Sequence, residues 1–382
     1  MTYKPLLLLL SFLAACQQSP KAPSTSSGES HLTHKSTVIE DSATLFASSR
    51  NGEKGTLIPM KYARNIVMVR YSDHTIVTLK DPWHKGKTLH TYNITTPVTR
   101  SIVFTAAHCQ LLQWLDAGKA ITGVCDRQYI HPSILNSQHS SGIADCGNSM
   151  SPDIEKIVSL RPQVLIVSPF ENSGGFGMIE KTNIPIIEAA EYMEPTALGR
   201  AEWMKFYGIL YGREREADSL FHVVDSTYHA LKSIAKKTKT RPVLLTERKT
   251  GSVWYVPGGN SSVAQIITDA GGTPPTTLIN PHLSKSGSLA LSPEAVLAHA
   301  SHIDIWAFKY TGSRPLSPQQ LIAEYHGYKM LRAFQTGNVY QCNTLKQPYF
   351  EEISFRPDFL LREFIILLHP ELHLGSLRYY TK

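Results

Sequence analysis

Two short stretches of the sequence contain residue types that could carry out nucleophilic catalysis. The first, TAAHC at 105–109, contains His108, and the second, ENSGGFG at 171–177, contains Ser173 among glycines. A histidine that removes the proton of a serine hydroxyl creates a nucleophile for acyl transfer, but this chemistry also needs an acid that orients the imidazole and N–H groups that stabilise the oxyanion. Asp145 and Asp153 are available for the acid role only by their position in the chain.

The elements that would have to position these groups argue against a protease. TAAHC matches the surroundings of the general-base histidine of trypsin-like enzymes, which consist of antiparallel barrels. Here His108 and Ser173 are 65 residues apart, helices are predicted between them, and NSGGFG lacks both the aspartate before the protease serine and the proline after its glycines. We interpret the match as coincidental. An enzyme of another kind, a hydrolase or chelatase that uses His108 or Ser173, stays as the alternative from a different functional class.

The first sixteen residues predict export. Lys4 precedes an apolar stretch from Leu6 to Leu13, and small residues then lead to Cys16. This order is typical of a secretory signal peptide over residues 1–15, and it resembles the lipobox of bacterial lipoproteins, in which the cysteine after the cleavage site carries diacylglycerol. The stretch is too short to span a bilayer as a mature helix, so the alternative is an ordinary cleaved signal with Cys16 incidental. Residues 16–59 are rich in Ser, Thr and Pro and predict a flexible tether, with the protein held in the periplasm by its lipid.

Length, composition and charge limit the number of domains and the kinds of partner that the chain can have. The 382 residues, 42% of them hydrophobic, are enough for two lobes of ordinary size. The net charge of +7 is spread along the sequence, and its densest basic run, at 236–241, is predicted to be the solvated end of a helix. A nucleic-acid site would need aromatic and further basic residues around that run, so we expect no nucleic-acid partner, and we expect a monomer.

Two cysteines follow short apolar runs, AITGVC and GIADC. Cys125 and Cys146 would therefore lie side by side if these runs are neighbouring parallel strands. An exported protein meets an oxidising compartment, so the pair predicts either a disulfide or two free buried thiols. No HExxH or CxxC pattern occurs in the sequence. We therefore expect no intrinsic cofactor or metal, and any metal should arrive within a bound ligand.

Strands and helices alternate along most of the chain. Residues 60–98 predict extra β strands, and after them strand and helix patterns alternate, which is typical of a parallel sheet. A helical pattern without Pro or Gly follows Arg213, and a second alternating series begins at RPVLLT. The predicted fold is α/β, with two Rossmann-like lobes at 60–212 and 239–382, a joining helix at 213–238 and a ligand cleft between the lobes.

The two lobes also repeat a pattern. EKIVSLRPQVLIV begins at Glu155 and EAVLAHASHIDIW at Glu294, and in both a glutamate opens a helix after Ser-Pro and a strand follows. An acid in the first helical turn is favourable in any α/β protein, so this repeat by itself has a purely structural explanation.

Taken in order, these segments resemble the periplasmic binding proteins of ABC importers for iron complexes and cobalamin, whose two lobes are joined by one long helix. The matching segments cover nearly everything after residue 98 and include SPDIEKIVSLRPQVLIV, EPTALGRAEWMKFYGILYGREREADSL and GGNSSVAQIITDAGG. The resemblance implies a binding protein without a chemical step, and it implies that Glu155 and Glu294 dock on an ABC permease dimer. The strands at 60–98 are absent from the smallest members of that family.

Such a protein needs a cleft lined where strands end, because open parallel sheets bind ligands at their carboxyl edges. Aromatic walls suit a large metal chelate or tetrapyrrole, and a histidine or tyrosine could ligate its metal or bond its periphery. The sequence leaves open a ferric siderophore, haem or cobalamin as ligand, and a surface adhesin as a third function. Trp306 fits the core as well as the cleft, and His131 has a structural alternative. The candidates are Tyr129, His131, Phe170, Trp254, Tyr255, Asn260 and Trp306.

Overall fold

The computed structural model describes residues 54–136, 142–170, 175–279 and 287–382. Cys16, the predicted signal peptide and Ser173 lie outside the described residues. The predicted tether at 16–59 is described only from Lys54, and strand β1 (Thr56–Ile58) already pairs there with β2 (Ile66–Arg70). The folded part therefore begins before residue 60, which corrects the predicted boundary.

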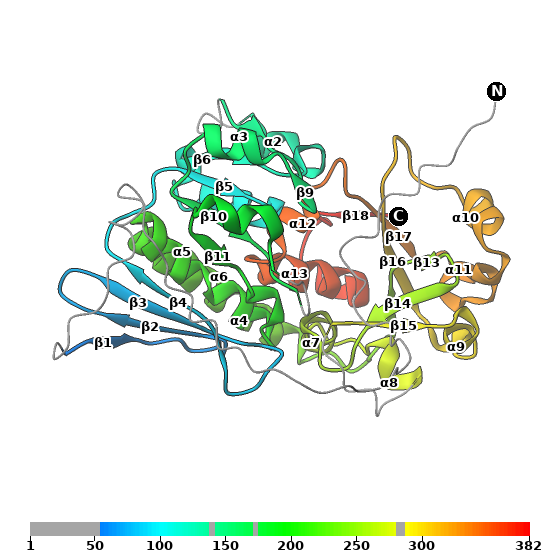
Figure 1. Cartoon of the computed structure of the whole chain (residues 1–382). Coiled ribbons are helices and arrows are strands. Elements are labelled where there is room, and N and C mark those ends of the chain that lie inside the picture. Colours follow the sequence, from blue (N-terminus) through cyan, green and yellow to red (C-terminus); the bar gives the residue numbers. More distant parts are fainter. Residues whose placement is uncertain (1–53, 137–141, 171–174, 280–286) are drawn as a thin grey trace, which may run out of the picture.

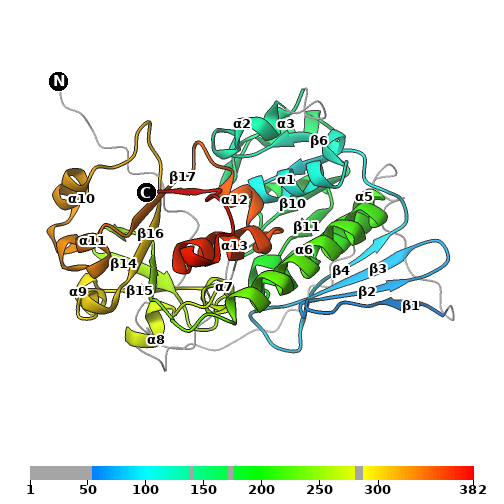
Figure 2. The same ribbon diagram turned by 180° about the vertical axis from the view of Figure 1, so that it is seen from behind.

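The first sheet is an antiparallel meander in the order β1-β2-β3-β4, with β3 at Thr75–Lys80 and β4 at Thr88–Ile94. Alternate residues of its strands, such as Met68 and Val77, are fully buried, which is the pattern of a sheet with one covered face. The sheet runs beside helices α5 and α6 (Figures 1 and 2). Tyr92 joins it to the next sheet, since its hydroxyl donates to Ile186 O and accepts from Glu188 N.

The second sheet forms the N-terminal lobe and is wholly parallel, in the order β11-β10-β5-β6-β7. Its central strand β10 is apolar throughout and fully buried, as expected where helices cover both faces. Ile157 of α3 packs on one face, and α1 covers the other, where Thr105 caps its first turn. The elements are β5 (Ser101–Val103), α1 (Ala106–Trp114), β6 (Ile121–Val124), α2 (Pro132–Leu135), β7 (Ala144–Asp145), β8 (Gly147–Asn148), β9 (Ser151–Pro152), α3 (Ile154–Ser159), β10 (Val164–Val167) and β11 (Ile186–Glu188).

Three consecutive helices follow: α4 (Ala197–Glu202), α5 (Met204–Tyr211) and α6 (Glu214–Ala235). Gly212 ends α5 with a φ of 64°, a left-handed conformation that favours glycine. The 22 residues of α6 make a rod about 33 Å long at 1.5 Å per residue. Its buried residues recur every three or four positions, as in Phe221, Val224 and Tyr228, so one face packs on the protein along its length. This is the long helix expected at 213–238.

The C-terminal lobe has a second sheet in the order β12-β16-β17-β18, parallel except for the last pair, and a small antiparallel sheet, β13-β14-β15. A separate core of aromatic residues, including Trp254 and Trp306, lies between them. The elements are β12 (Leu244–Thr246), β13 (Lys249–Thr250), β14 (Val253–Pro257), α7 (Ser262–Asp269), α8 (Pro275–Ile279), β15 (Ser288–Leu291), α9 (Pro293–Leu297), β16 (Ile305–Tyr310), α10 (Pro318–Glu324), α11 (Arg332–Gln335), β17 (Val339–Asn343) and β18 (Tyr380–Thr381).

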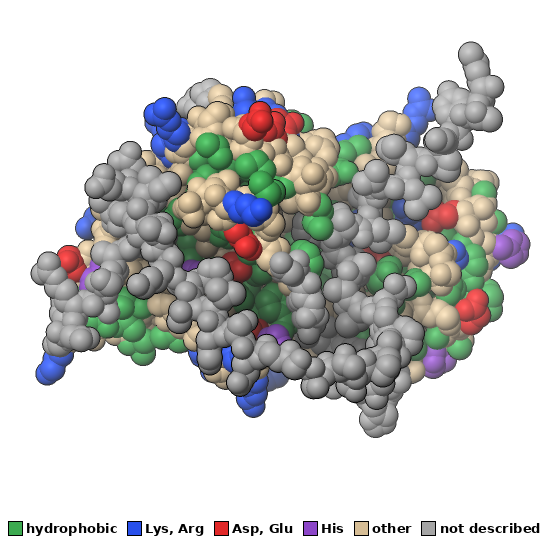
Figure 3. Space-filling view, in the orientation of Figure 1, with side chains coloured by type: hydrophobic (Ala, Val, Ile, Leu, Met, Phe, Trp, Pro, Cys, Tyr) green, Lys and Arg blue, Asp and Glu red, His purple; other side chains and the backbone are tan. Residues whose placement is uncertain are grey.

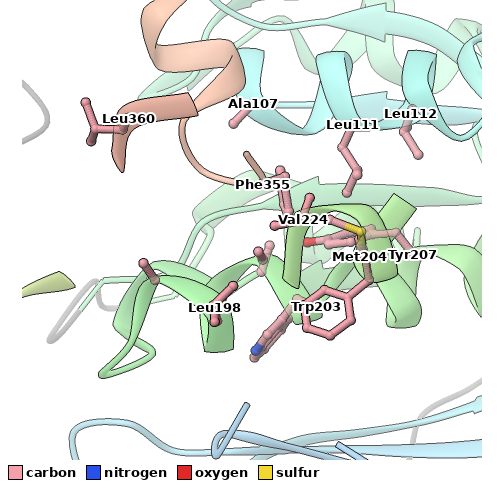
Figure 4. Packing of buried hydrophobic residues seen from close by; sticks show 14 of the residues in the cluster. Ala107, Leu111, Leu112, Leu198, Trp203, Met204, Tyr207, Val224, Phe355 and Leu360 are labelled. Carbon is pink, nitrogen blue, oxygen red and sulfur yellow. The ribbon is translucent and has the colours of Figure 1, made fainter. Parts of the chain in front are cut away.

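The chain returns to the first lobe before it ends. Helix α12 (Tyr349–Glu352) packs on α1, and α13 (Pro357–Leu368) packs along α6 and α7. Phe355, between them, lies 5.8 Å from the His108 ring and 6.0 Å from the Tyr207 ring, measured between centroids, and points toward the side chains of α1 and α6 (Figure 4). Residues 239–382 therefore do not form one independent lobe, because their last helices belong to the core that the two halves share.

Candidate ligand-binding site

Exposed aromatic side chains gather where strands of the N-terminal lobe end. Tyr129 follows β6, Phe170 follows β10 and Tyr192 follows β11, and their side chains are 50%, 44% and 37% exposed. All three come after carboxyl ends of one parallel sheet, the edge at which open α/β sheets bind ligands. Tyr129 and Phe170 were predicted here. Tyr192 was not predicted, because the sequence EAAEY gives no local sign that β11 ends at Glu188.

Tyr192 is fixed in place. Its hydroxyl donates to the carbonyl of Pro169 at the end of β10, which ties two neighbouring strand ends together. Burial raises the pKa of Tyr192 to about 12, so the phenol stays protonated near neutral pH. Its ring can therefore provide apolar contact area, while its hydroxyl is already used within the protein.

His131 joins the lobes. Its backbone N–H donates to Glu351 Oε1 at 3.0 Å, and Nε2 lies 3.3 Å from the carbonyl oxygen of Lys346. Nδ1 lies 3.3 Å from the backbone N of Ser133, which donates to it, so Nε2 carries the ring proton. Both ring nitrogens therefore have partners within the protein, which gives His131 a structural role, and its predicted contact with the ligand stays a prediction.

Trp254 and Trp306 also require correction. Both side chains are fully buried, and both indole N–H groups donate to the backbone carbonyl of Glu247, at 3.2 and 2.8 Å. They form the core of the C-terminal lobe, because the β13-β14-β15 sheet folds over β12 and β16 and covers them. A buried indole with its one donor satisfied presents no surface to a ligand.

The second lobe contributes a different set of groups at its strand ends. Asn260 is exposed just before α7, and Tyr255 is partly buried on β14. Glu247, which ends β12 with a φ of 69°, forms an ion pair with Lys309 on β16. A non-glycine residue held in the left-handed region at a strand end is a common sign of a functional segment. Burial lowers the pKa of Lys309 to about 8.

Phe350 is a further exposed aromatic residue. Its side chain is 50% exposed on α12, and its ring centroid lies 6.0 Å from Lys309 Nζ. The molecule is hollowed near the middle of the face shown in Figure 3, and hydrophobic side chains form part of the recessed surface. Lys309 and Phe350 were missed from the sequence because each lies inside a regular strand or helix pattern, and Glu247 was missed because no local pattern predicts its left-handed backbone.

His108 belongs to a buried polar cluster. It is 1% exposed, its Nδ1 lies 2.5 Å from Thr105 Oγ1, and its Nε2 lies 2.8 Å from Tyr207 Oη and 3.3 Å from Glu191 Oε1. Burial by itself would raise the pKa of Glu191, but the charge of His108 and its hydrogen bond, together with the charge of Arg200, hold that pKa below its ordinary value. The TAAHC motif is thus a helix cap followed by a core histidine.

Of the two alternatives for Cys125 and Cys146, a disulfide or two free buried thiols, the structure has the free thiols. Cys125 and Cys146 do follow neighbouring parallel strands, β6 and β7, and both are buried, but both thiols are free. Cys125 Sγ lies 3.7 Å from the carbonyl oxygen of Cys146. Burial raises the pKa of the Cys146 thiol to about 11, so the thiolate that forms disulfides is scarce at neutral pH.

The two predicted docking glutamates occupy equivalent places. Glu155 is the second residue of α3 and Glu294 the second residue of α9, and both are exposed. Asp153 and Ser292 supply the N-caps by accepting hydrogen bonds from backbone N–H groups. Neither glutamate is therefore needed as a cap, and neither forms an ion pair within the part of the chain that the structure describes.

The described ranges contain no group of three or more His, Cys, Asp or Glu side chains placed to hold a metal ion. A pocket of about 630 Å³ lies away from the strand ends, between the β1–β2 edge and helices α5 and α6, and Arg70 and Glu214 form an ion pair across it. Charged and apolar side chains both line it. The carboxyl edges of the two lobes are the better location for a large flat ligand.

Comparison with known proteins defines the class. The family model described as periplasmic binding protein matches residues 107–344, so the chain belongs to the periplasmic binding protein family. Members of this family bind substrates for transport and are not enzymes. An uncharacterized lipoprotein of Methanocaldococcus jannaschii is 28% identical over 308 residues, covering 77% of this chain and 70% of the relative. A second uncharacterized lipoprotein of that organism is 23% identical over 248 residues, covering 63% of this chain and 61% of the relative.

Solved structures show the same two-lobed fold. A periplasmic binding protein from Veillonella parvula has a TM-score of 0.60 at 13% identity, covering 78% of this chain and 98% of that one. The periplasmic haem-binding protein RhuT from Roseiflexus has a TM-score of 0.56 at 18% identity, covering 71% and 98%. An ABC-type Fe3+-hydroxamate transport protein from Saccharomonospora viridis has a TM-score of 0.57 at 15% identity, covering 73% and 96%.

Proposed function

We propose that this protein is a lipid-anchored solute-binding protein that captures an iron complex, a ferric siderophore or haem, and delivers it to an ABC permease. The observation that carries the proposal is the row of exposed aromatic rings, Tyr129, Phe170 and Tyr192, at the carboxyl edge of a lobe of this fold. Flat apolar walls at that edge suit a large, flat or rounded chelate better than a sugar or an amino acid, which require mainly hydrogen-bonding groups.

The choice of ligand draws support from the relatives as well. Structures of similar fold include haem-binding and Fe3+-hydroxamate transport proteins. Cobalamin has comparable size and remains the second candidate within the same class. The metal would arrive inside its chelate, since the residues of the site offer aromatic and charged groups rather than a set of metal ligands.

The attachment to a membrane is proposed from the sequence. Leu13, Ala14, Ala15 and Cys16 have the order of a lipoprotein cleavage site, and two of the relatives are named lipoproteins. In the residues that the structure describes, no helix has both the length and the apolar character that spanning a membrane requires. A diacylglyceryl group on Cys16 would tether the folded lobes through the segment before Lys54.

Delivery would use the two exposed glutamates. Glu155 and Glu294 occupy the same position in the first turns of α3 and α9, one in each lobe. Two separated carboxylates can meet basic pockets on the two halves of a permease dimer and fix the orientation of the binding protein. Both are exposed, and neither forms an ion pair with any residue that the structure describes, which leaves them available for this contact.

A binding experiment tests the proposal. The full-length protein carrying Cys16→Ser, to keep it soluble, is titrated with haem, a ferric trihydroxamate and cobalamin, and the absorption spectrum of each is followed. Phe170→Ala should weaken binding of the accepted ligand at least about fivefold through lost apolar contact. Leu57→Ala, at an exposed position on β1, is the matched control and should not. Failure of all three ligands to bind, or a product whose formation depends on His108, would refute the proposed function.

A further inference from the structure

Arg200 presents an unusual arrangement at the junction of the lobes. It lies on α4 and is largely buried, and its Nε has no hydrogen-bond partner. Within the described ranges, the guanidinium group of Arg200 forms no hydrogen bond and no ion pair with another residue. A buried guanidinium is costly unless a partner satisfies its donors, so an arginine left open in this way points to a partner that comes from outside the chain.

The surroundings place Arg200 next to the proposed ligand edge. Helix α4 contacts the turn at 191–193 that follows β11, so Arg200 lies near the carboxylate of Glu191, with which its charge interacts, and near Tyr192, one of the exposed aromatic residues. The start of α4 also touches the other lobe, since Ala197 N donates to Gln265 Oε1 on α7 at 3.4 Å. Arg200 thus lies on a helix that contacts both the turn after β11 and α7 of the other lobe.

The carboxylate of Glu191 interacts with the positive charge of Arg200 but forms no ion pair with it. Glu191 is 2% exposed, its Oε1 is 3.3 Å from His108 Nε2, and its Oε2 has no hydrogen-bond partner. The carboxylate therefore supports a cation nearby but forms no ion pair with it. One fixed negative charge also limits what can enter, because a dianion would be repelled more strongly than a monoanion.

We propose that Arg200 is an anion-binding residue that holds a carboxylate of the bound iron complex, so that the protein selects chelates with a free carboxylate. This inference rests on the proposed function and specifies its ligand. The planar guanidinium fork matches a carboxylate, and a charge-assisted pair is stronger than a neutral hydrogen bond. The aromatic rings at Phe170 and Tyr192 then contact the apolar part of the same ligand.

The test uses two matched pairs of ligands, which separate the two sources of such a carboxylate. Haem is compared with haem dimethyl ester, in which the propionates are blocked, and a ferric citrate-hydroxamate siderophore with a free carboxylate is compared with a ferric trihydroxamate without one. The wild-type protein should bind the carboxylate-bearing member of one pair more tightly by roughly tenfold or more, and Arg200→Gln should remove that preference. Arg215→Gln, an exposed arginine on α6, is the control and should leave the preference unchanged.

Each other outcome is decisive as well. If the members of each pair bind equally well and Arg200→Gln changes neither, the carboxylate proposal is wrong while the proposed function stands. If Arg200→Gln weakens both members alike, Arg200 is structural. If inorganic phosphate displaces the ligand and acetate does not, the anion is not a carboxylate. If the wild-type protein binds none of the four chelates, the proposed function fails and this inference with it. Should Arg200→Gln not fold, Arg200→Lys, which keeps the charge but loses the fork, should reduce the preference in part.

Discussion

Replacement of Glu202 by alanine tests how the first sheet is attached to the rest of the molecule. Glu202 is fully buried on α4, and its carboxylate accepts hydrogen bonds from the backbone N–H groups of Lys61, Tyr62 and Ala63 at 2.8, 2.7 and 2.9 Å. Lys205 Nζ lies 3.2 Å from the same carboxylate. The alanine variant would leave three backbone donors without their acceptor at the turn between β1 and β2.

The size of the effect follows from these contacts. A hydrogen bond to a charged group contributes about 1.5–3 kcal/mol, so three would amount to about 4.5–9 kcal/mol if they were independent. They share one acceptor, however, and two of the three N–H groups are only partly buried, so water can replace part of the loss. The variant also avoids the cost of burying a carboxylate. We therefore expect the free energy of unfolding to fall by about 3 kcal/mol, within the range for removing one partner of a buried charged pair.

Urea unfolding and amide hydrogen exchange measure this effect. The exchange of the amides of Lys61 to Ala63 should become faster in Glu202→Ala, and the melting temperature should fall by about 5–10 °C. Glu214→Ala is the matched control, because Glu214 forms an ion pair with Arg70 in which both side chains are more than 40% exposed, and its loss should cost less than about 1 kcal/mol. If Glu202→Ala lies within 1 kcal/mol of the wild type and the three amides stay protected, the reasoning is refuted.

Three further predictions concern attachment, delivery and pH. Cys16→Ser should leave the lobes folded and move the protein from the membrane to the soluble fraction, and unchanged detergent partitioning would contradict the lipid anchor. The double variant Glu155→Lys, Glu294→Lys should abolish uptake in cells while ligand affinity stays near that of the wild type, because reversed charges would oppose the permease; normal uptake would exclude the docking role. In the folded protein the pKa of Glu191 is held below its usual 4.5 in spite of burial. The ionised carboxylate therefore stabilises the fold at pH values above about 4.5, and this contribution is lost as the pH falls through the pKa that Glu191 has in the folded protein. The stability difference between wild type and Glu191→Gln should therefore shrink in urea titrations between pH 7 and pH 3, and a constant difference would show that the charge of Glu191 is irrelevant.

The sequence by itself determined the local elements and their order. The helical pattern after Arg213, free of Pro and Gly, predicted α6 because one apolar stripe at a spacing of three or four is a local property. The alternation of apolar strands with helices predicted the parallel sheet, since strands buried on both faces are apolar throughout. Tyr129 and Phe170 were predicted as ligand-binding residues for a related reason: each comes after such a strand, and the carboxyl ends of parallel strands meet at one edge.

Only the tertiary structure decided which surfaces stay exposed. Trp254 and Trp306 end in the core because a sheet formed partly by residues 288–291 covers them, and their own strands carry no sign of that later segment. His131 is engaged by Glu351, which lies 220 residues further along the chain. Arg200 occupies an ordinary helical position in the sequence, and its unsatisfied donor arises from the way α4 packs against the 191–193 turn and α7. Burial and hydrogen-bond partners depend on which distant segments meet, and local patterns do not encode those contacts.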